Sequence, residues 1–240
     1  MKEILKHLLK RIEDFFFPPM CAVCQKPLDS DGLCPECFKN LKFITPPYCP
    51  VCGRPLPFET PGDLTCAVCL KKRPPYDKMR SICVYNDGIK PLLLGFKHGR
   101  RFDYIPLLVR LLKQADPSLF TENEVFISVP LHWTRLMKRG YNQAALLAGE
   151  LAKTYHKTYD PGVLKRRRLT RSQGHLSLDQ RRRNVAGAFY VPKPALIKDK
   201  NILLIDDVIT TGATVAGCVR ALKRAGAKSV SVLSIARVVK

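Results

Sequence analysis

Cysteines are concentrated in the first third of the chain, where eight of the ten form four C-x-x-C pairs. A two-residue gap lets both thiolates of a pair face one metal ion, and two pairs complete the sulfur tetrahedron that zinc favours. Because four sulfurs leave no open coordination position, such an ion has a structural role. Two ions are expected, with the pairs more naturally taken in sequence order than interleaved: Cys21, Cys24, Cys34 and Cys37 for one, and Cys49, Cys52, Cys66 and Cys69 for the other.

Two other uses of paired cysteines compete with zinc. Disulfides need an oxidising compartment, and the charged N-terminus lacks the unbroken apolar core of a secretory signal. A redox C-x-x-C normally stands alone at a helix start beside a strand, whereas four pairs here lie in a Pro-rich stretch. The two remaining cysteines, Cys83 and Cys218, lie among apolar residues and are expected to be buried and unreactive.

A second group of chemically capable residues follows a short apolar run near the C-terminus. Residues 202–205 precede two adjacent carboxylates, Asp206 and Asp207, and a Thr- and Gly-rich loop. Loop amides at a helix start favour a phosphate, and ligands of open α/β sheets bind beyond the carboxyl ends of strands. Two acids would repel a phosphate unless they accept hydrogen bonds from sugar hydroxyls between them. A ribose 5-phosphate suits both the acids and the loop. Its hydroxyls would contact the acids, and its phosphate would be bound by Thr210, Thr211, Gly212, Ala213 and Thr214.

The plainer alternative is that the acids cap the following helix and that Thr-Thr-Gly is only a turn. Capping needs one acid, not two after an all-apolar strand. A nucleotide P-loop is excluded, because the chain has no G-x-x-x-x-G-K-[ST] motif.

The elements that position these residues follow from the hydrophobic pattern. Composition changes near residues 73–76, which divides the chain into an amphipathic helix (1–19), a double zinc-ribbon module (20–73) and an α/β domain (76–240). Apolar runs alternating with helical periodicities in the last unit predict βαβ units on a mostly parallel sheet. We expect strands at 80–85, 125–129, 163–167, 188–191, 201–205 and 229–235, and helices at 89–97, 102–114, 142–155 and 214–225.

The formal net charge of +21 favours anionic partners such as nucleic acid, phosphorylated metabolites or acidic protein surfaces. It does not choose among them. No run of about 18 apolar residues exists, so no stable membrane insertion is expected. Without a secretory signal, the expected location is cytoplasmic.

The segment LLIDDVITTGAT, residues 203–214, resembles the phosphoribosyl-pyrophosphate (PRPP) signature of type I phosphoribosyltransferases. This resemblance implies a sheet with helices on both faces, catalytic acids Asp206 and Asp207 on the ribose hydroxyls, and Mg²⁺ bound with PRPP. The order of further motifs narrows the match to the ComF family, which is linked to natural competence, transformation and DNA uptake. These motifs are the C-x-x-C pairs, SVPLH (128–132), RGYNQ (139–143), TRSQ (170–173) and RNVAGAF (183–189).

The resemblance also suggests which cations meet the pyrophosphate, whose several charges suit lysines and arginine forks. One loop follows the first core strand and a second, mobile loop lies near residues 166–173. The candidates are His132, Arg135, Lys138 and Arg139 in the first, and Arg168 and Arg171 in the second. Lys97 and His98 either reach the site or face water.

Three functions remain open at this stage. The first is a PRPP-binding competence protein that acts with single-stranded DNA and a competence helicase. The second is an active phosphoribosyltransferase, for which the sequence shows no acceptor-binding signature. The third is a zinc-module adaptor or DNA-binding protein with a vestigial PRPP site, against which the intact 202–214 motif argues.

Overall fold

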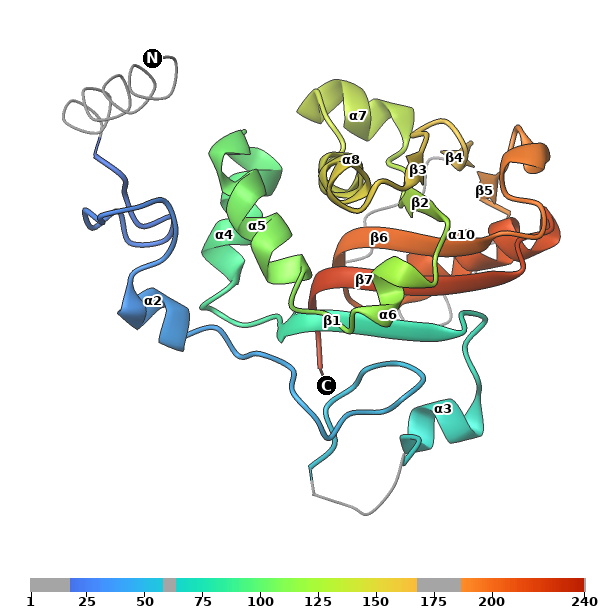
Figure 1. The fold of residues 1–240 in the computed structure, drawn as a ribbon, viewed down its shortest axis with the longest axis horizontal. Helices are drawn as coiled ribbons and strands as arrows, with labels where there is room; N and C mark the ends of the chain where they lie inside the picture. Colours follow the sequence, from blue (N-terminus) through green and yellow to red (C-terminus); the bar gives the residue numbers. More distant parts are fainter. Residues whose placement is uncertain (1–17, 58–63, 168–186, 240) are drawn as a thin grey trace.

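A parallel five-stranded sheet with strand order β1-β7-β6-β2-β3 forms the centre of the molecule (Figure 1). The computed structural model describes residues 18–57, 64–167 and 187–239. The parallel sheet confirms the predicted α/β class. Its strands are β1 (Lys78–Val84), β2 (Val125–Ser128), β3 (Thr158–Tyr159), β6 (Asn201–Ile209) and β7 (Ser229–Arg237).

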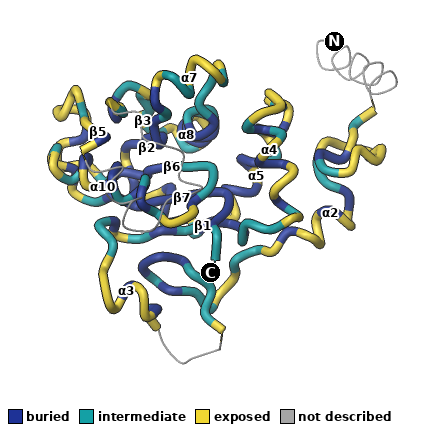
Figure 2. Tube along the Cα trace, turned by 180° about the vertical axis from the view of Figure 1, so that it is seen from behind, coloured by how far each residue is buried: buried dark blue, intermediate teal, exposed yellow. Residues whose placement is uncertain are grey.

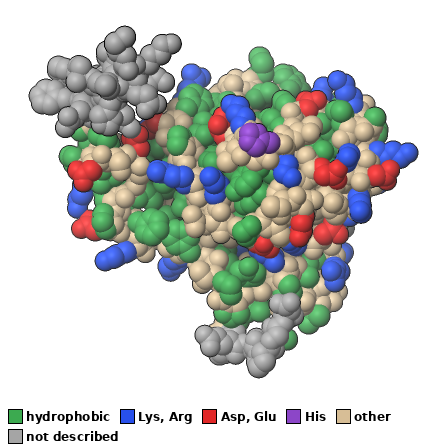
Figure 3. Space-filling view, in the orientation of Figure 1, with side chains coloured by type: hydrophobic (Ala, Val, Ile, Leu, Met, Phe, Trp, Pro, Cys, Tyr) green, Lys and Arg blue, Asp and Glu red, His purple; other side chains and the backbone are tan. Residues whose placement is uncertain are grey.

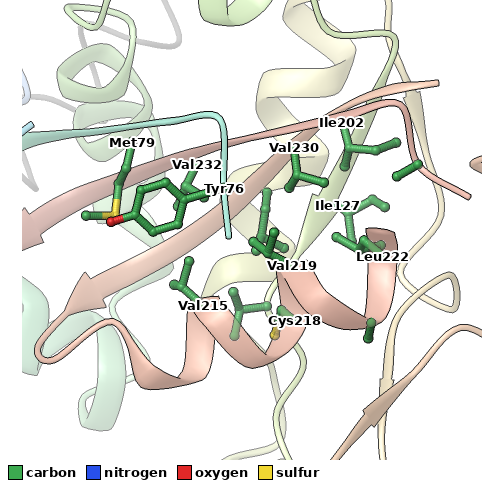
Figure 4. Packing of buried hydrophobic residues seen from close by; sticks show 14 of the residues in the cluster. Tyr76, Met79, Ile127, Ile202, Val215, Cys218, Val219, Leu222, Val230 and Val232 are labelled. Atoms are coloured by element: carbon green, nitrogen blue, oxygen red, sulfur yellow. The ribbon is translucent and has the colours of Figure 1, made fainter. Parts of the chain in front are cut away.

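Helices cover both faces of this sheet, as expected. One face is covered by α10 (Ala213–Arg224), and the other by α4 (Lys90–His98), α5 (Ile105–Leu112) and α8 (Gln143–Tyr155). Val215 and Val219 of α10 lie between the helix and the strands, facing Val230 and Val232 of β7 (Figure 4). Burial on both faces explains why the central strands read as continuous apolar runs rather than as alternating ones.

Several elements depart from the sequence prediction. The expected strands at 163–167 and 188–191 shrink to β4 (Lys165–Arg166) and β5 (Phe189–Tyr190), which form a separate antiparallel pair. β6 continues to residue 209 because its pairing with β7 runs as far as Ile209 and Arg237. The helix predicted at 102–114 is divided into η1 (Phe102–Tyr104) and α5. The structure adds β3 and the short elements α6 (Ser118–Thr121), α7 (Trp133–Arg139) and η3 (Pro194–Leu196).

The cysteine-rich segment, with its short helices α2 (Pro35–Lys39) and α3 (Ala67–Lys71), lies along the outer edge of the sheet (Figure 1). Backbone hydrogen bonds of 2.8 Å run from the amides of Val84 and Met79 in β1 to the carbonyls of Lys42 and Val51. An uncovered edge strand would expose unpaired backbone groups, and this segment satisfies part of that edge. Its own outer surface is exposed, most clearly on α2 and α3 (Figure 2).

The two cysteine clusters are attached differently. Cys49, Cys52, Cys66 and Cys69 belong to the same buried cluster as the α10 face of the sheet. Tyr76 and Met79 belong to this cluster too and lie beside Val232 of β7 (Figure 4). Cys21, Cys34 and Cys37 form a small cluster of their own. The predicted boundary at residues 73–76 thus lies between two segments that share one core. The predicted helix at 1–19 lies almost entirely outside the described residues.

Among the described residues, no helix combines the length and the hydropathy that crossing a bilayer requires.

Candidate functional site

A cavity of about 320 Å³ opens at the carboxyl ends of β2 and β6. Its lining contains three sets of residues, two from residues 206–214 and one from distant parts of the chain. These are the acids Asp206 and Asp207, the loop residues Thr210, Gly212, Ala213 and Thr214, and the cations Lys97, Arg135, Arg139 and Arg166. Thr211 belongs to the same loop but lies outside the lining, where its Oγ1 accepts a 3.4 Å hydrogen bond from the amide of Ala213.

The two acids have different surroundings. Asp206 keeps some exposure to the cavity, but the enclosing protein and then the negative charge of Asp207 raise its pKa well above the ordinary value. The amide of Asp207 donates to Asp206 Oδ1 at 2.9 Å, which opposes that rise. Asp207 Oδ2 lies 3.7 Å from Lys97 Nζ, and its Oδ1 accepts from the amide of Val208 at 2.8 Å. The carboxylate of Asp207 is therefore paired with Lys97, whereas the ionised form of Asp206 is disfavoured by burial and by the charge of Asp207.

The loop that follows the acids starts α10 with a left-handed residue. Gly212 has φ +73°, and a Cβ built there would meet nothing within 4 Å. Glycine is thus required by the backbone conformation rather than by lack of space. This turn ends in a twelve-residue helix whose first amides face the cavity end of the sheet. Such amides, with the helix dipole behind them, suit an anion.

The buried side-chain amide of Gln143 hydrogen-bonds both Arg139 and the backbone of Lys97. Gln143 is 2% exposed, accepts from Arg139 Nη1 at 3.3 Å and donates from Nε2 to the carbonyl of Lys97 at 3.2 Å. Burial lowers the pKa of Arg139, and the charge of Asp207 opposes this. Gln143 therefore fixes the Arg139 side chain and the Lys97 backbone in the ligand-free protein.

Arg166 approaches the same cavity from β4. Its guanidinium lies 5.4 Å from the ring centroid of Phe189. Burial and then the charge of Arg135 lower its pKa, whereas the charge of Asp206 raises it. A partly desolvated cluster of like charges of this kind gains most from an anionic ligand with several charges.

Of the other pyrophosphate candidates, His132 and Lys138 do not line the cavity. His132 is 3% exposed, caps α7 and bonds Thr134 Oγ1 through Nδ1 at 2.8 Å, so it does not line the cavity. Lys138 is also absent from the lining. Arg168 and Arg171 lie outside the described residues. From the sequence, Lys97 was undecided, Arg166 appeared only as the start of the second loop, and Gln143 had no assigned role, because their approach to the cavity depends on packing between distant elements.

The eight paired cysteines form two clusters, and this confirms the sequential grouping. Within each set of four, the Sγ atoms all lie within 4.8 Å of one another. Backbone amides of Cys34 and Cys66 donate to Cys21 Sγ and Cys49 Sγ, each at 3.4 Å, as expected around thiolates that bind a metal. Four converging sulfurs complete the tetrahedron of a zinc ion and leave no coordination position open, which fits a structural role. Cys83 and Cys218 are buried away from both clusters, as predicted.

The zinc sites differ in exposure and in their neighbours. Cys24 of the first site is exposed, whereas all four ligands of the second site are buried. The side chain of Arg237, at the end of β7, donates from Nη1 to the carbonyl of Cys52. Burial raises the pKa of the Cys52 thiol, and the charge of Arg237 opposes that rise. All four cysteines of the second site share a core with the α10 face of the sheet, whereas the first site contacts the domain through Ala22, whose carbonyl accepts from the Tyr104 hydroxyl at 2.6 Å.

Comparison with known proteins agrees with this two-part composition. The double zinc ribbon domain family matches residues 12–70, and the phosphoribosyl transferase domain family matches residues 137–238. DNA utilization protein YhgH of Escherichia coli K12 is 32% identical over 225 residues, which covers 91% of this chain and 90% of the relative. Competence protein F of Haemophilus influenzae is 34% identical over 227 residues, with coverage of 91% and 90%. Competence protein ComFC of Streptococcus pneumoniae is 28% identical over 167 residues, with coverage of 66% and 67%.

Similarity over nearly the whole length of both chains, with a zinc ribbon followed by a phosphoribosyltransferase domain in the same order, shows that this chain belongs to the ComF family.

Proposed function

We propose that this chain binds PRPP together with Mg²⁺ in the cavity at the ends of β2 and β6. One observation carries the proposal: acids, a glycine-containing helix start and four cations line the same 320 Å³ space. This volume lies at the lower end of the range of roughly 300–1,000 Å³ that is typical of small-molecule pockets. The acids suit the ribose diol, the helix start suits the 5-phosphate, and the cations suit the pyrophosphate of one PRPP molecule.

In the proposed complex the acids bind the sugar. Asp206 and Asp207 accept hydrogen bonds from the ribose hydroxyls, and the amides and hydroxyls of residues 210–214 hold the 5-phosphate. Magnesium, when bound, neutralises part of the pyrophosphate charge and is held mainly by ligand oxygens, with the carboxylates nearby as hard oxygen donors.

The cations hold the other end of the ligand. Arg135 and Arg139 come from α7, which follows β2, and Lys97 and Arg166 reach the cavity from α4 and β4. Arginine forks and a lysine ammonium together match the several oxygens of a pyrophosphate. His132 and Lys138 are not assigned to this role, since neither lines the cavity.

Thermal unfolding with separate ligand fragments tests these assignments. A ligand that binds only the folded state raises stability by RT ln(1 + [L]/Kd). With Mg²⁺ present, we expect PRPP to raise the midpoint more than equal concentrations of ribose 5-phosphate or pyrophosphate. An unchanged midpoint with PRPP at millimolar concentration contradicts the proposal. Thr214→Val should reduce the shift from ribose 5-phosphate but leave that from pyrophosphate largely unchanged.

We also propose that the chain acts in competence-related DNA uptake. The support comes from the relatives, which are named for competence and for DNA utilization, and from the net charge of +21. On the face in Figure 3, Lys and Arg are interspersed with Asp and Glu rather than gathered in one patch. A gel shift with single-stranded DNA at several salt concentrations tests direct contact: affinity should fall steeply with salt if phosphates are bound. No shift at low salt would leave partner proteins, such as a helicase, as the route to DNA.

A further inference from the structure

Arg237 connects the second zinc site with the phosphate loop. Arg237 is 6% exposed. Its Nη1 donates a hydrogen bond to the carbonyl of Cys52, and its Nε has no hydrogen-bond partner among the described residues. Burying a guanidinium costs several kcal/mol unless opposite charge or hydrogen bonds compensate. The Arg237 side chain is therefore held by the C-x-x-C turn from Cys49 to Cys52, which we call the zinc knuckle.

The backbone of the same residue reaches the other site. Arg237 is the β-partner of Ile209, and the amide of Val238 donates to the carbonyl of Ile209 at 2.8 Å. Ile209 lines the cavity and directly precedes Thr210, the first residue of the phosphate loop. One residue thus contacts the metal site through its side chain and the start of the loop through its strand.

A bound zinc ion would stabilise both ends of this connection. A Zn²⁺ ion held by four thiolates carries a net charge of about −2, which matches the buried cation. The ion also fixes the knuckle around Cys52, whose carbonyl Arg237 binds. The carbonyl of Val51 in that knuckle accepts from the amide of Met79 in β1, so the metal site is also hydrogen-bonded to the edge strand of the sheet.

The first zinc site has no such connection to the phosphate loop among the described residues. Tyr104 of η1 donates from its hydroxyl to the carbonyl of Ala22, between Cys21 and Cys24, at 2.6 Å, and Arg110 of α5 donates from Nη2 to the carbonyl of Asp31 at 2.9 Å. The Arg110 bond is exposed, and α5 packs on the face of the sheet opposite α10. An arginine thus binds a backbone carbonyl in each zinc ribbon, but only one of these arginines lies in a strand beside the phosphate loop.

We propose that Arg237 is a positioning residue that makes the order of the phosphate loop depend on metal occupancy of the second zinc site. The first zinc site has no such effect. The ligand-binding consequence rests on the proposed PRPP function, whereas the coupling itself is a property of the ligand-free protein.

The test compares Arg237→Met, Arg237→Lys and Arg110→Met in the zinc-loaded, full-length protein. Zinc release to a chromogenic chelator is followed over time, and alkylation of the freed cysteines identifies the emptied site. Hydrogen exchange of peptides covering residues 206–216 reports the order of the loop without any ligand. Removing an outer-shell partner typically weakens metal binding by roughly 10- to 100-fold.

We expect Arg237→Met to speed zinc loss from the second site by about tenfold and to raise exchange in the loop. Arg237→Lys should bring the rate of zinc loss and the loop exchange part of the way back to wild type. Arg110→Met should leave loop exchange at the wild-type level. Unchanged loop exchange in Arg237→Met overturns the proposal. Exchange raised equally in β2 and in the loop also overturns it, because that result indicates general destabilisation.

A second arm covers the case in which Arg237→Met does not fold. Wild-type protein is treated with chelator, and loop exchange is measured after each zinc ion leaves. The coupling requires the rise to follow loss of the second site, and a rise after loss of the first site contradicts it. Absence of PRPP binding by wild type would refute the proposed function alone, since neither measurement of exchange contains ligand.

Discussion

Lys97 Nζ lies 3.7 Å from Asp207 Oδ2, so a cation from α4 neutralises the second acid of the motif in the ligand-free cavity. This lysine precedes the segment that matches the phosphoribosyl transferase domain family, residues 137–238. Its backbone is held in turn by Gln143 of α8. The site is thus completed by a helix from outside that segment.

Replacing Lys97 with Met should weaken PRPP binding. A hydrogen bond to a charged group contributes about 1.5–3 kcal/mol, so a loss of about tenfold or more in affinity is expected. Lys90→Met provides the matched control, because Lys90 lies at the other end of α4 and makes an exposed 3.7 Å pair with Asp87. Equal affinities for the two variants by calorimetry would remove Lys97 from the site.

Asp206→Asn should stabilise the ligand-free protein while impairing ligand binding. Enclosure and the charge of Asp207 raise the pKa of Asp206, so the folded state favours the protonated acid. The associated stability is complete below the ordinary pKa and is lost as the pH rises through the raised one. We therefore expect a higher unfolding midpoint for Asp206→Asn at pH 8, and convergence with wild type near pH 4. For a chain of this size about 2–4 °C corresponds to 1 kcal/mol. A lower midpoint for the variant at pH 8 would contradict this account.

Gly212→Ala should separate loop geometry from overall stability. The residue has φ +73°, and a left-handed conformation costs a non-glycine residue about 1–2 kcal/mol. Gly187→Ala is the control, since Gly187 has φ +64° and equally open surroundings. Both variants should lose similar unfolding free energy, but only Gly212→Ala should bind PRPP more weakly. Parallel losses of PRPP affinity in both would indicate a global effect.

Chelation should empty the two zinc sites in order. The first site includes the exposed Cys24, whereas the second is buried within the main core. We expect the first zinc ion to leave without loss of the far-UV circular dichroism of the sheet, and the second to leave with a drop in thermal stability. Simultaneous release of both ions would show that the ribbons form one unit.

Local features of the fold and site could be read from the sequence. Residues 202–214 place acids and a phosphate loop after a buried strand, and the spacing of the cysteines predicts their grouping. Both depend on neighbours within a few residues or on a strict repeat. The strand at 229–235 and the helix at 142–155 were also close to their observed bounds, because each has a sustained apolar period.

What the sequence did not show depends on distant packing. α7 has no buried residue, with Trp133 64% and Met137 78% exposed, so it produces no core-facing stripe and its sequence predicts a loop. β4 and β5 resemble sheet strands in composition, yet they pair only with each other. Contacts such as Arg237 with Cys52 join residues 185 positions apart, and no local pattern encodes them.

The proposed function depends above all on Asp206 and Asp207 binding the sugar of PRPP. Isothermal titration of PRPP with Mg²⁺ into wild type and into Asp206→Asn/Asp207→Asn, with circular dichroism to confirm that both are folded, tests it most directly. We expect a saturable binding heat for wild type and none for the double variant at the same concentrations. Identical titrations for the two proteins would contradict it.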